Sequence, residues 1–161
     1  GITFNIQFDD SMSNRIWADE HALSKIAINL LSNAIKFTEK GDVTLKIWRQ
    51  QENWCLRVTD TGIGIPEDMH EIIFESFRQV DTTFQRAYGG TGLGLAIVSH
   101  LVKAMDGTVG IQSTVGVGSQ FTVTLPLKCP AEISNLENDQ LRSINDSNSR
   151  VDTERLAGVG D

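Results

Sequence analysis

Hydrophobic and polar residues alternate in several stretches of the chain, which is the pattern of β-strands. The first stretch places Ile2, Phe4, Ile6 and Phe8 between polar neighbours. This period of two predicts an opening strand with one buried face. Four further stretches show the same alternation: 43–47, 54–58, 109–111 and 121–125. The chain is therefore expected to form five strands, with turns at the polar residues 50–53 and at the glycines 116 and 118.

Two other stretches have the period of a helix. From Asp19, which is suited to be an N-cap, one face is apolar and comprises Leu23, Ile26, Ala27, Leu30, Ala34 and Phe37. Gly41 is expected to end this helix. A second helix is predicted over 92–105, closed by Asp106 and Gly107. Pro66 suits the first turn of a third, short helix that carries Ile72 and Ile73.

Strands and helices are mixed along the chain without strict alternation. This order predicts an α+β fold, a two-layer sandwich with a mixed, mostly antiparallel sheet covered on one face by about three helices. Residues 78–91 have no sustained apolar period and predict a long loop. Beyond Pro130, Ser, Asn, Asp and Glu dominate. We therefore predict a domain over 1–128 and a largely disordered polar tail or linker over 129–161.

Composition excludes several functions. The 161 residues are 40% hydrophobic, which suffices for one core, and their net charge is −7. An acidic chain is poorly suited to nucleic acid or to a membrane surface. No apolar run could span a bilayer and no signal peptide is evident. Cys55 and Cys129 lie far apart and form no metal or disulfide pattern, so a reducing, cytoplasmic setting is expected, with membrane anchoring of a longer parent protein left open.

The predicted first helix carries a polar line beside its apolar face. Asn29 and Asn33 are four residues apart, and Lys36 follows three residues later. Such spacing points the three side chains in one direction. Amide oxygens suit Mg²⁺, and amide nitrogens and a lysine suit phosphate. A solvated helix edge would show the same pattern, so that the line alone does not establish a site.

Asp60 ends the third predicted strand in the same parity as its apolar residues. Its carboxylate is therefore expected to face the helices, where it needs a hydrogen-bond donor. The amine of adenine would serve, and Gly62 and Gly64 would let a flat ring approach the backbone. An aspartate that merely ends a strand before a glycine turn is a common alternative.

A third candidate element precedes the second predicted helix. Residues 89–95 read Gly-Gly-Thr-Gly-Leu-Gly-Leu, and closely spaced glycines before a helix free N–H groups for a phosphate. The segment does not follow a strand, as a dinucleotide fingerprint does. It also lacks the Gly-Lys-Ser/Thr ending of a P-loop.

In this order, these segments resemble the catalytic ATP-binding domain of two-component sensor histidine kinases. Residues 29–38 resemble the N box of that family, and 60–65 resemble its first glycine box. Residues 73–77 resemble the F box, 89–95 the second glycine box, and 116–121 a Gly-x-Gly-Ser/Thr-x-Phe element. The resemblance covers most of residues 1–128. It implies the Bergerat fold, with ATP and Mg²⁺ as cofactors.

Carried over by residue, the resemblance assigns Mg²⁺ to Asn33, and metal or phosphates to Asn29. Lys36 would contact the phosphate chain and Asp60 would recognise adenine. The resemblance further implies nucleotide contacts by Phe37, Gly62, Gly64, Ile65, Gly90, Thr91, Gly92, Leu93 and Gly94.

Arg86 is the candidate for a γ-phosphate contact during transfer, ahead of Arg78. The catalytic group would then be Asn29, Lys36 and Arg86. A solvated loop arginine is the alternative interpretation of Arg86.

The resemblance favours a kinase over an ATPase. Related ATPases carry a glutamate at the position of Asn29 to activate water, and an amide cannot act as that base. The acceptor is expected to be a histidine on a separate dimerisation domain, because His21, His70 and His100 lack the family's acceptor context. A response regulator receiver domain is the expected downstream partner, and the isolated domain is expected to be monomeric. An anti-sigma-type kinase of the same superfamily and a nucleotide-sensing interaction module remain as alternatives.

Overall fold

The computed structural model describes residues 1–9, 16–75 and 93–128, and in them the strands form one sheet in the order β1-β2-β3-β5-β4. The strands are β1 (Ile2–Phe8), β2 (Gly41–Gln50), β3 (Asn53–Asp60), β4 (Thr108–Thr114) and β5 (Gly118–Pro126). β1 is parallel to β2, and every other pair is antiparallel. The mixed, mostly antiparallel sheet expected from the sequence is confirmed.

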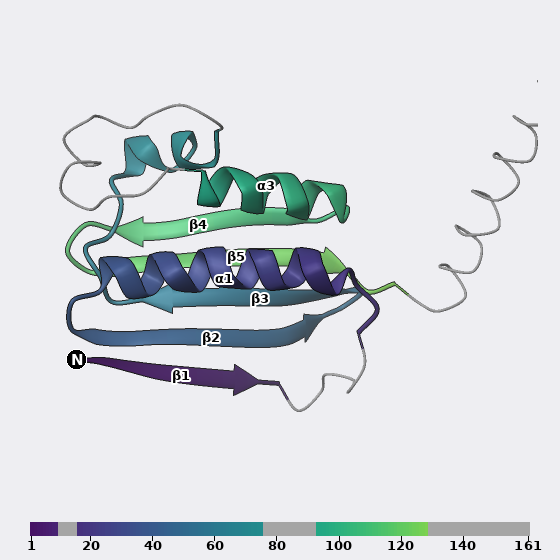
Figure 1. The fold of residues 1–161 in the computed structure, drawn as a ribbon, viewed down its shortest axis with the longest axis horizontal. Helices are drawn as coiled ribbons and strands as arrows, with labels where there is room; N and C mark the ends of the chain where they lie inside the picture. The colour runs from purple at the N-terminus through teal and green to yellow at the C-terminus, as the bar shows by residue number, and fades with distance from the viewer. Residues whose placement is uncertain (10–15, 76–92, 129–161) are drawn as a thin grey trace, which may run out of the picture. The chain divides into compact units, whose positions relative to one another are not determined.

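Helices lie over one face of this sheet (Figure 1). The long helices of the described residues are α1 (Glu20–Phe37) and α3 (Gly94–Ala104). Two short 3-10 helices, η1 (Glu67–Met69) and η2 (Ile72–Phe74), lie between β3 and α3 in the sequence. The α+β fold class is therefore confirmed. The short helix predicted after Pro66 is divided in two, because the chain turns at His70 and Glu71 between the two 3-10 segments.

The ends of α1 follow partly from the predicted signals. Asp19 is the N-cap, and its side-chain oxygen accepts the Ala22 N–H at 2.9 Å. The prediction that Gly41 ends the helix is wrong: α1 ends at Phe37, and Thr38 is already extended. Gly41 instead opens β2 with a φ of +126°. Glycine is needed at position 41 because a side chain would collide with the hydroxyl of Thr61.

The core lies between the helices and the covered face of the sheet. α1 contributes Ile26, Leu30 and Ala34, and α3 contributes Val98 and Val102. The strands contribute side chains at alternate positions, as the period of two predicted. These are Val43, Trp54, Leu56, Val58, Phe121, Val123 and Leu125. Phe74 of η2 adds an edge-to-face contact with Phe121, with ring centroids 6.2 Å apart.

The prediction of a buried face on the first strand is wrong. Phe4, Ile6 and Phe8 are 48%, 53% and 66% exposed. β1 is an outer strand that pairs only with β2, and α1 lies above β3 rather than above β1 (Figure 1). The alternation of β1 therefore produces an apolar stripe that no described residue covers.

Two sequence predictions lie outside the described residues. These are the loop at 78–91 and the tail at 129–161, so that the division of the chain at residue 128 stays a prediction. The second helix is present, although its predicted first residue, Gly92, also lies outside the described part. Among the described helices, none is long and apolar enough to cross a membrane.

Leu30→Ala tests the core. Leu30 is fully buried on the face of α1 that packs against the sheet, so the truncation should lower the free energy of unfolding by about 2–5 kcal/mol. Ile28→Ala on the same helix is the matched control, because Ile28 is 65% exposed and its truncation should change stability by less than about 1 kcal/mol. Urea titration followed by circular dichroism measures both. Equal losses in the two variants would contradict the assignment of the buried face.

Candidate functional site

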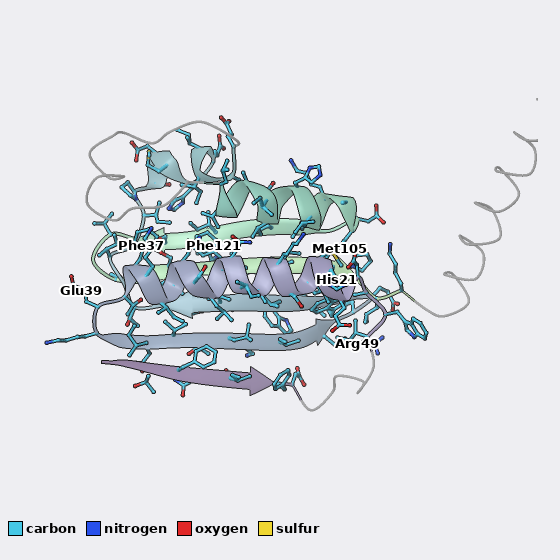
Figure 2. All side chains as sticks on the ribbon, viewed as in Figure 1. His21, Phe37, Glu39, Arg49, Met105 and Phe121 are labelled. Carbon is cyan, nitrogen blue, oxygen red and sulfur yellow. The ribbon has the colours of Figure 1, made fainter. Side chains whose placement is uncertain are left out.

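The predicted site residues of the described part gather at one edge of the sandwich. This edge is formed by the last residues of α1 and β3 and by the first residues of α3 and β5 (Figure 1). Phe37 marks it in Figure 2, while His21 lies at the opposite end of α1. The described parts of the three candidate elements, the third from residue 93 onward, thus lie at the same edge although they are far apart in sequence.

Asp60 is the buried charged group of this edge. It is 6% exposed, at the end of β3 and on the covered face, as its parity predicted. Oδ1 accepts the Gly62 N–H at 2.8 Å and the Ser119 N–H at 3.3 Å. Both bonds end on the same oxygen, so among the described residues Oδ2 is left for another donor.

The environment of Asp60 disfavours its charge. Burial raises the pKa of the carboxyl above its ordinary value of 3.8, and the N–H groups of Gly62 and Ser119 lower it by less. A ligand that donates to Oδ2 would relieve this cost. The charged form of Asp60 is therefore more stable when a ligand donates a hydrogen bond to Oδ2 than when Oδ2 has no donor.

The glycine loop that follows, residues 61–65, is held from two sides. The Ile63 N–H donates to the Phe37 carbonyl at 3.2 Å, and the Ile63 carbonyl accepts the Gly116 N–H at 2.8 Å. Gly64 has a φ of +71°, and a side chain there would collide with the Thr114 carbonyl. The loop is thus packed between the end of α1 and the β4–β5 hairpin.

Polar side chains that the sequence analysis did not select complete this arrangement. Ser113 Oγ accepts the Ile65 N–H at 2.8 Å and lies 3.0 Å from Ser119 Oγ. The Nε2 of His70 lies 3.1 Å from the Ile65 carbonyl. Ser119 stood in the Gly-x-Gly-Ser/Thr-x-Phe element and could have been selected for that reason. No local sequence pattern marks Ser113 or His70 as site residues. The partner of Ser113 is 48 residues away, and the partner of His70 is a backbone carbonyl.

Asn29 faces the start of α3. Its Nδ2 donates to the Lys25 carbonyl at 2.8 Å, which fixes the orientation of the amide and leaves Oδ1 pointing away from α1. A Cβ on Gly94 would lie only 2.7 Å from this Oδ1. Glycine at position 94 therefore lets α3 begin directly against Asn29.

The start of α3 is not capped by the side chain of its N-cap residue. Leu93 is apolar and makes no side-chain capping bond to the N–H groups of the first turn. These groups carry the positive end of the helix dipole. The edge therefore combines a carboxylate, amide oxygens and a helix N-terminus that can hold an anion.

Asn33 and Lys36 extend the line of Asn29 toward the end of α1. The side chain of Asn33 is half-buried, and no described residue hydrogen-bonds its amide. The Nζ of Lys36 lies 5.0 Å from the centre of the Phe37 ring. The described residues contain no group of three His, Cys, Asp or Glu side chains suited to a metal, so an ion at this edge would use amide oxygens and the ligand itself.

The remaining predicted site residues are not described by the structure. Arg86, Gly90, Thr91 and Gly92 all lie between residues 76 and 92, outside the described ranges. Their predicted contacts stay predictions.

A family model matches most of the chain. Residues 18–129 match the model for histidine kinase-, DNA gyrase B-, and HSP90-like ATPases.

Named relatives make the comparison more specific. The circadian input-output histidine kinase CikA of Synechococcus elongatus is 49% identical over 75% of this chain and 17% of its own length. The sensor histidine kinase RcsC of Escherichia coli is 47% identical over 68% of this chain and 12% of its own length. The chain thus spans less than a fifth of these two relatives.

Solved structures agree with the sequence matches. Full-length ShkA in complex with AMPPNP superposes with a TM-score of 0.69 at 38% identity, over 78% of this chain and 26% of that one. The catalytic domain of the histidine kinase ThkA superposes with a TM-score of 0.66 at 28% identity, over 78% of this chain and 79% of that one. The second structure matches this fold over most of its length.

The raised pKa of Asp60 predicts a specific pH dependence of stability. The folded state holds this proton more tightly than the unfolded state does, so stability should fall as pH rises from about 3.8 through the folded pKa, then level off. Asp60→Asn keeps an acceptor oxygen and removes the charge, so this variant should lack the part of the pH dependence that arises from Asp60. The measurement is the difference in unfolding free energy between wild type and Asp60→Asn from pH 3.5 to 8. A difference that stayed constant, or that favoured wild type as pH rose, would contradict the assignment.

Proposed function

The chain belongs to the family of histidine kinase-, DNA gyrase B-, and HSP90-like ATPases, as an ATP-binding catalytic domain of the sensor histidine kinase type, and we propose how its residues act. It binds ATP with Mg²⁺ and presents the γ-phosphate to a histidine on a separate dimerisation domain. The observation that carries this proposal is the convergence at one edge of the buried Asp60, the asparagines of α1 and the start of α3.

Adenine recognition is proposed for Asp60 and the glycine loop. The Oδ2 of Asp60 is available to accept the exocyclic N–H of adenine, which a guanine oxygen could not supply. Gly62 and Gly64 let the loop pack against the Phe37 and Thr114 carbonyls, where a side chain would collide. Ile65 and Phe37 offer apolar surface beside the loop. Such a pocket favours a flat ring with one donor at its edge.

The phosphates are proposed to lie between α1 and the start of α3. One N–H of the Asn29 amide is bound to the Lys25 carbonyl, so the oxygen is the proposed metal contact and the second N–H can donate to a phosphate. Asn33, whose amide has no partner among the described residues, is the proposed Mg²⁺ ligand. Lys36, Leu93 and Gly94 complete the phosphate side. When bound, Mg²⁺ would neutralise charge on the phosphate oxygens.

The segment before α3 is proposed to close over the phosphates. Gly90, Thr91 and Gly92 would supply backbone contacts, and Arg86 would stabilise charge on the γ-phosphate during transfer. These roles rest on the family resemblance alone.

Transfer is proposed in preference to hydrolysis. The Asn29 amide has no basic lone pair near neutral pH, so it cannot activate water as a glutamate could. Phosphoryl transfer needs mainly positioning and charge neutralisation from the protein. A domain that holds ATP and lacks a base can therefore deliver phosphate to a nucleophile that another domain supplies.

The partners are proposed on the same grounds. The relatives are much longer than this chain, so a histidine-bearing dimerisation domain and a response regulator receiver domain are assigned to the wider system. The described histidines are poor acceptor candidates. His21 is exposed at the end of α1 opposite the site edge (Figure 2), and His100 is exposed on α3. The Nε2 of His70 lies 3.1 Å from the Ile65 carbonyl of the glycine loop.

ATP binding measured by calorimetry, with and without Mg²⁺, tests the site. Wild type should bind ATP more tightly with Mg²⁺. Asn33→Ala should reduce that difference strongly, because the ion loses its main proposed protein ligand. Asp60→Ala should weaken binding about 10- to 100-fold in either condition, which corresponds to one hydrogen bond to a charged group.

Asn5→Ala on the exposed strand β1 is the matched control and should bind as wild type does. Circular dichroism confirms that each variant is folded. If folded wild type ignored ATP, the proposal would fail and an interaction module would be the better interpretation.

Phosphoryl transfer is tested by mixing the chain with a histidine-bearing dimerisation domain and γ-labelled ATP. Label should appear on the added domain and not on this chain. Asn33→Ala should slow transfer by about 100-fold, because the phosphates lose their positioned charge. His21→Ala and His100→Ala should leave the rate unchanged. Label retained on this chain would instead indicate an acceptor within it.

A further inference from the structure

Two hydrogen bonds join the glycine loop, residues 61–65, to the β4–β5 hairpin. One is the Gly116 bond to Ile63, and the other joins Ile65 to Ser113. This serine lies on the covered face of β4, in register with Ser119 of β5. Its Oγ accepts the Ile65 N–H at 2.8 Å and lies 2.9 Å from the Gly118 carbonyl and 3.0 Å from Ser119 Oγ. One hydroxyl thus links the loop to both residues at the start of β5.

The same two residues of β5 also hold Asp60. The Ser119 N–H donates to Asp60 Oδ1, and Gly118 packs so tightly on the Asp60 carbonyl that no side chain fits there. Ser113 is therefore bonded to the loop that follows Asp60 and to the strand that fixes its carboxylate. Neither property requires Ser113 to touch the nucleotide.

We propose that Ser113 is a positioning residue of the nucleotide site, which ties the glycine loop to the β4–β5 hairpin and so sets the position of the loop relative to Asp60. This inference rests on the proposed function. The serine hydroxyl has a single proton, and the Gly118 carbonyl can only accept it. Ser113 therefore accepts from the Ile65 N–H and donates its proton to the Gly118 carbonyl or to Ser119 Oγ, so that the partners of this hydroxyl all lie within the protein.

Removal of this hydroxyl would act locally. In Ser113→Ala the Ile65 N–H loses its acceptor, while the Gly116 bond to Ile63 and the Ser119 bond to Asp60 remain. The fold should persist, and the far end of the loop should move away from the adenine position. The adenine end is shared by ATP and ADP, so both nucleotides should lose affinity by the same factor.

The test compares Ser113→Ala, Ser113→Thr and Gln112→Ala in the full chain. Ser113→Ala should weaken ATP and ADP binding equally, by about tenfold, the magnitude of one hydrogen bond. Ser113→Thr keeps the hydroxyl and should restore wild-type affinity. Gln112→Ala is the matched control, because Gln112 lies next to Ser113 on β4, points to the opposite face and bonds only Gln120 there.

Amide hydrogen exchange followed by NMR supplies a readout that general destabilisation would not reproduce. Exchange of the Ile65 amide should accelerate in Ser113→Ala and stay slow in the other two variants, while core amides of β3 are unchanged. Wild-type affinity in Ser113→Ala, or an equal loss in Gln112→Ala, would overturn the positioning role alone. Failure of wild type to bind ATP would overturn the proposed function first, and the positioning role with it.

Discussion

The pairing of β3 with β5 is the constraint on which the site depends. In this register Trp54 lies opposite Leu125, Leu56 opposite Val123, and Val58 opposite Phe121, all on the covered face. The next pair on that face is Asp60 and Ser119. A shift of one residue would turn all of these side chains to the other face. The position of the carboxylate is thus determined by the apolar pairs that precede it.

Magnitudes explain why an unfavourable charge persists there. Each large apolar side chain on this face stabilises the fold by about 1.5–3 kcal/mol on burial, and six of them share the register with Asp60. Partial desolvation of one carboxylate, offset by the Gly62 and Ser119 N–H groups, costs less than this total. The strand can therefore keep Asp60 buried without rearranging. A ligand that donates a hydrogen bond to the carboxylate would then offset its desolvation cost.

Periodicity predicted the parts of the fold that a local pattern determines. The parity of Asp60, the N-cap at Asp19 and the buried face of α1 all follow from residues within one element. The exposed face of β1 does not, because alternation shows that one face is apolar but not that a helix is wide enough to cover it. Gly41 was assigned to the wrong element, since a glycine with positive φ suits the end of a helix and the start of a strand equally. Ser113 was not predicted because its partner Ile65 is 48 residues away and belongs to another element.

The two halves of the site differ in how they are held, and this difference suits their proposed tasks. The adenine half is bonded from three directions before any ligand arrives, by the end of α1, by the β4–β5 hairpin and by His70. A prepared pocket loses little conformational entropy on binding, so affinity is expected to arise mainly there. The proposed phosphate half instead offers Asn33, whose amide has no partner among the described residues, and the start of α3, where Leu93 makes no side-chain capping bond. Under the proposed function these groups would gain partners when the metal and phosphates bind, so this half is suited to orienting the γ-phosphate for transfer rather than to holding the nucleotide.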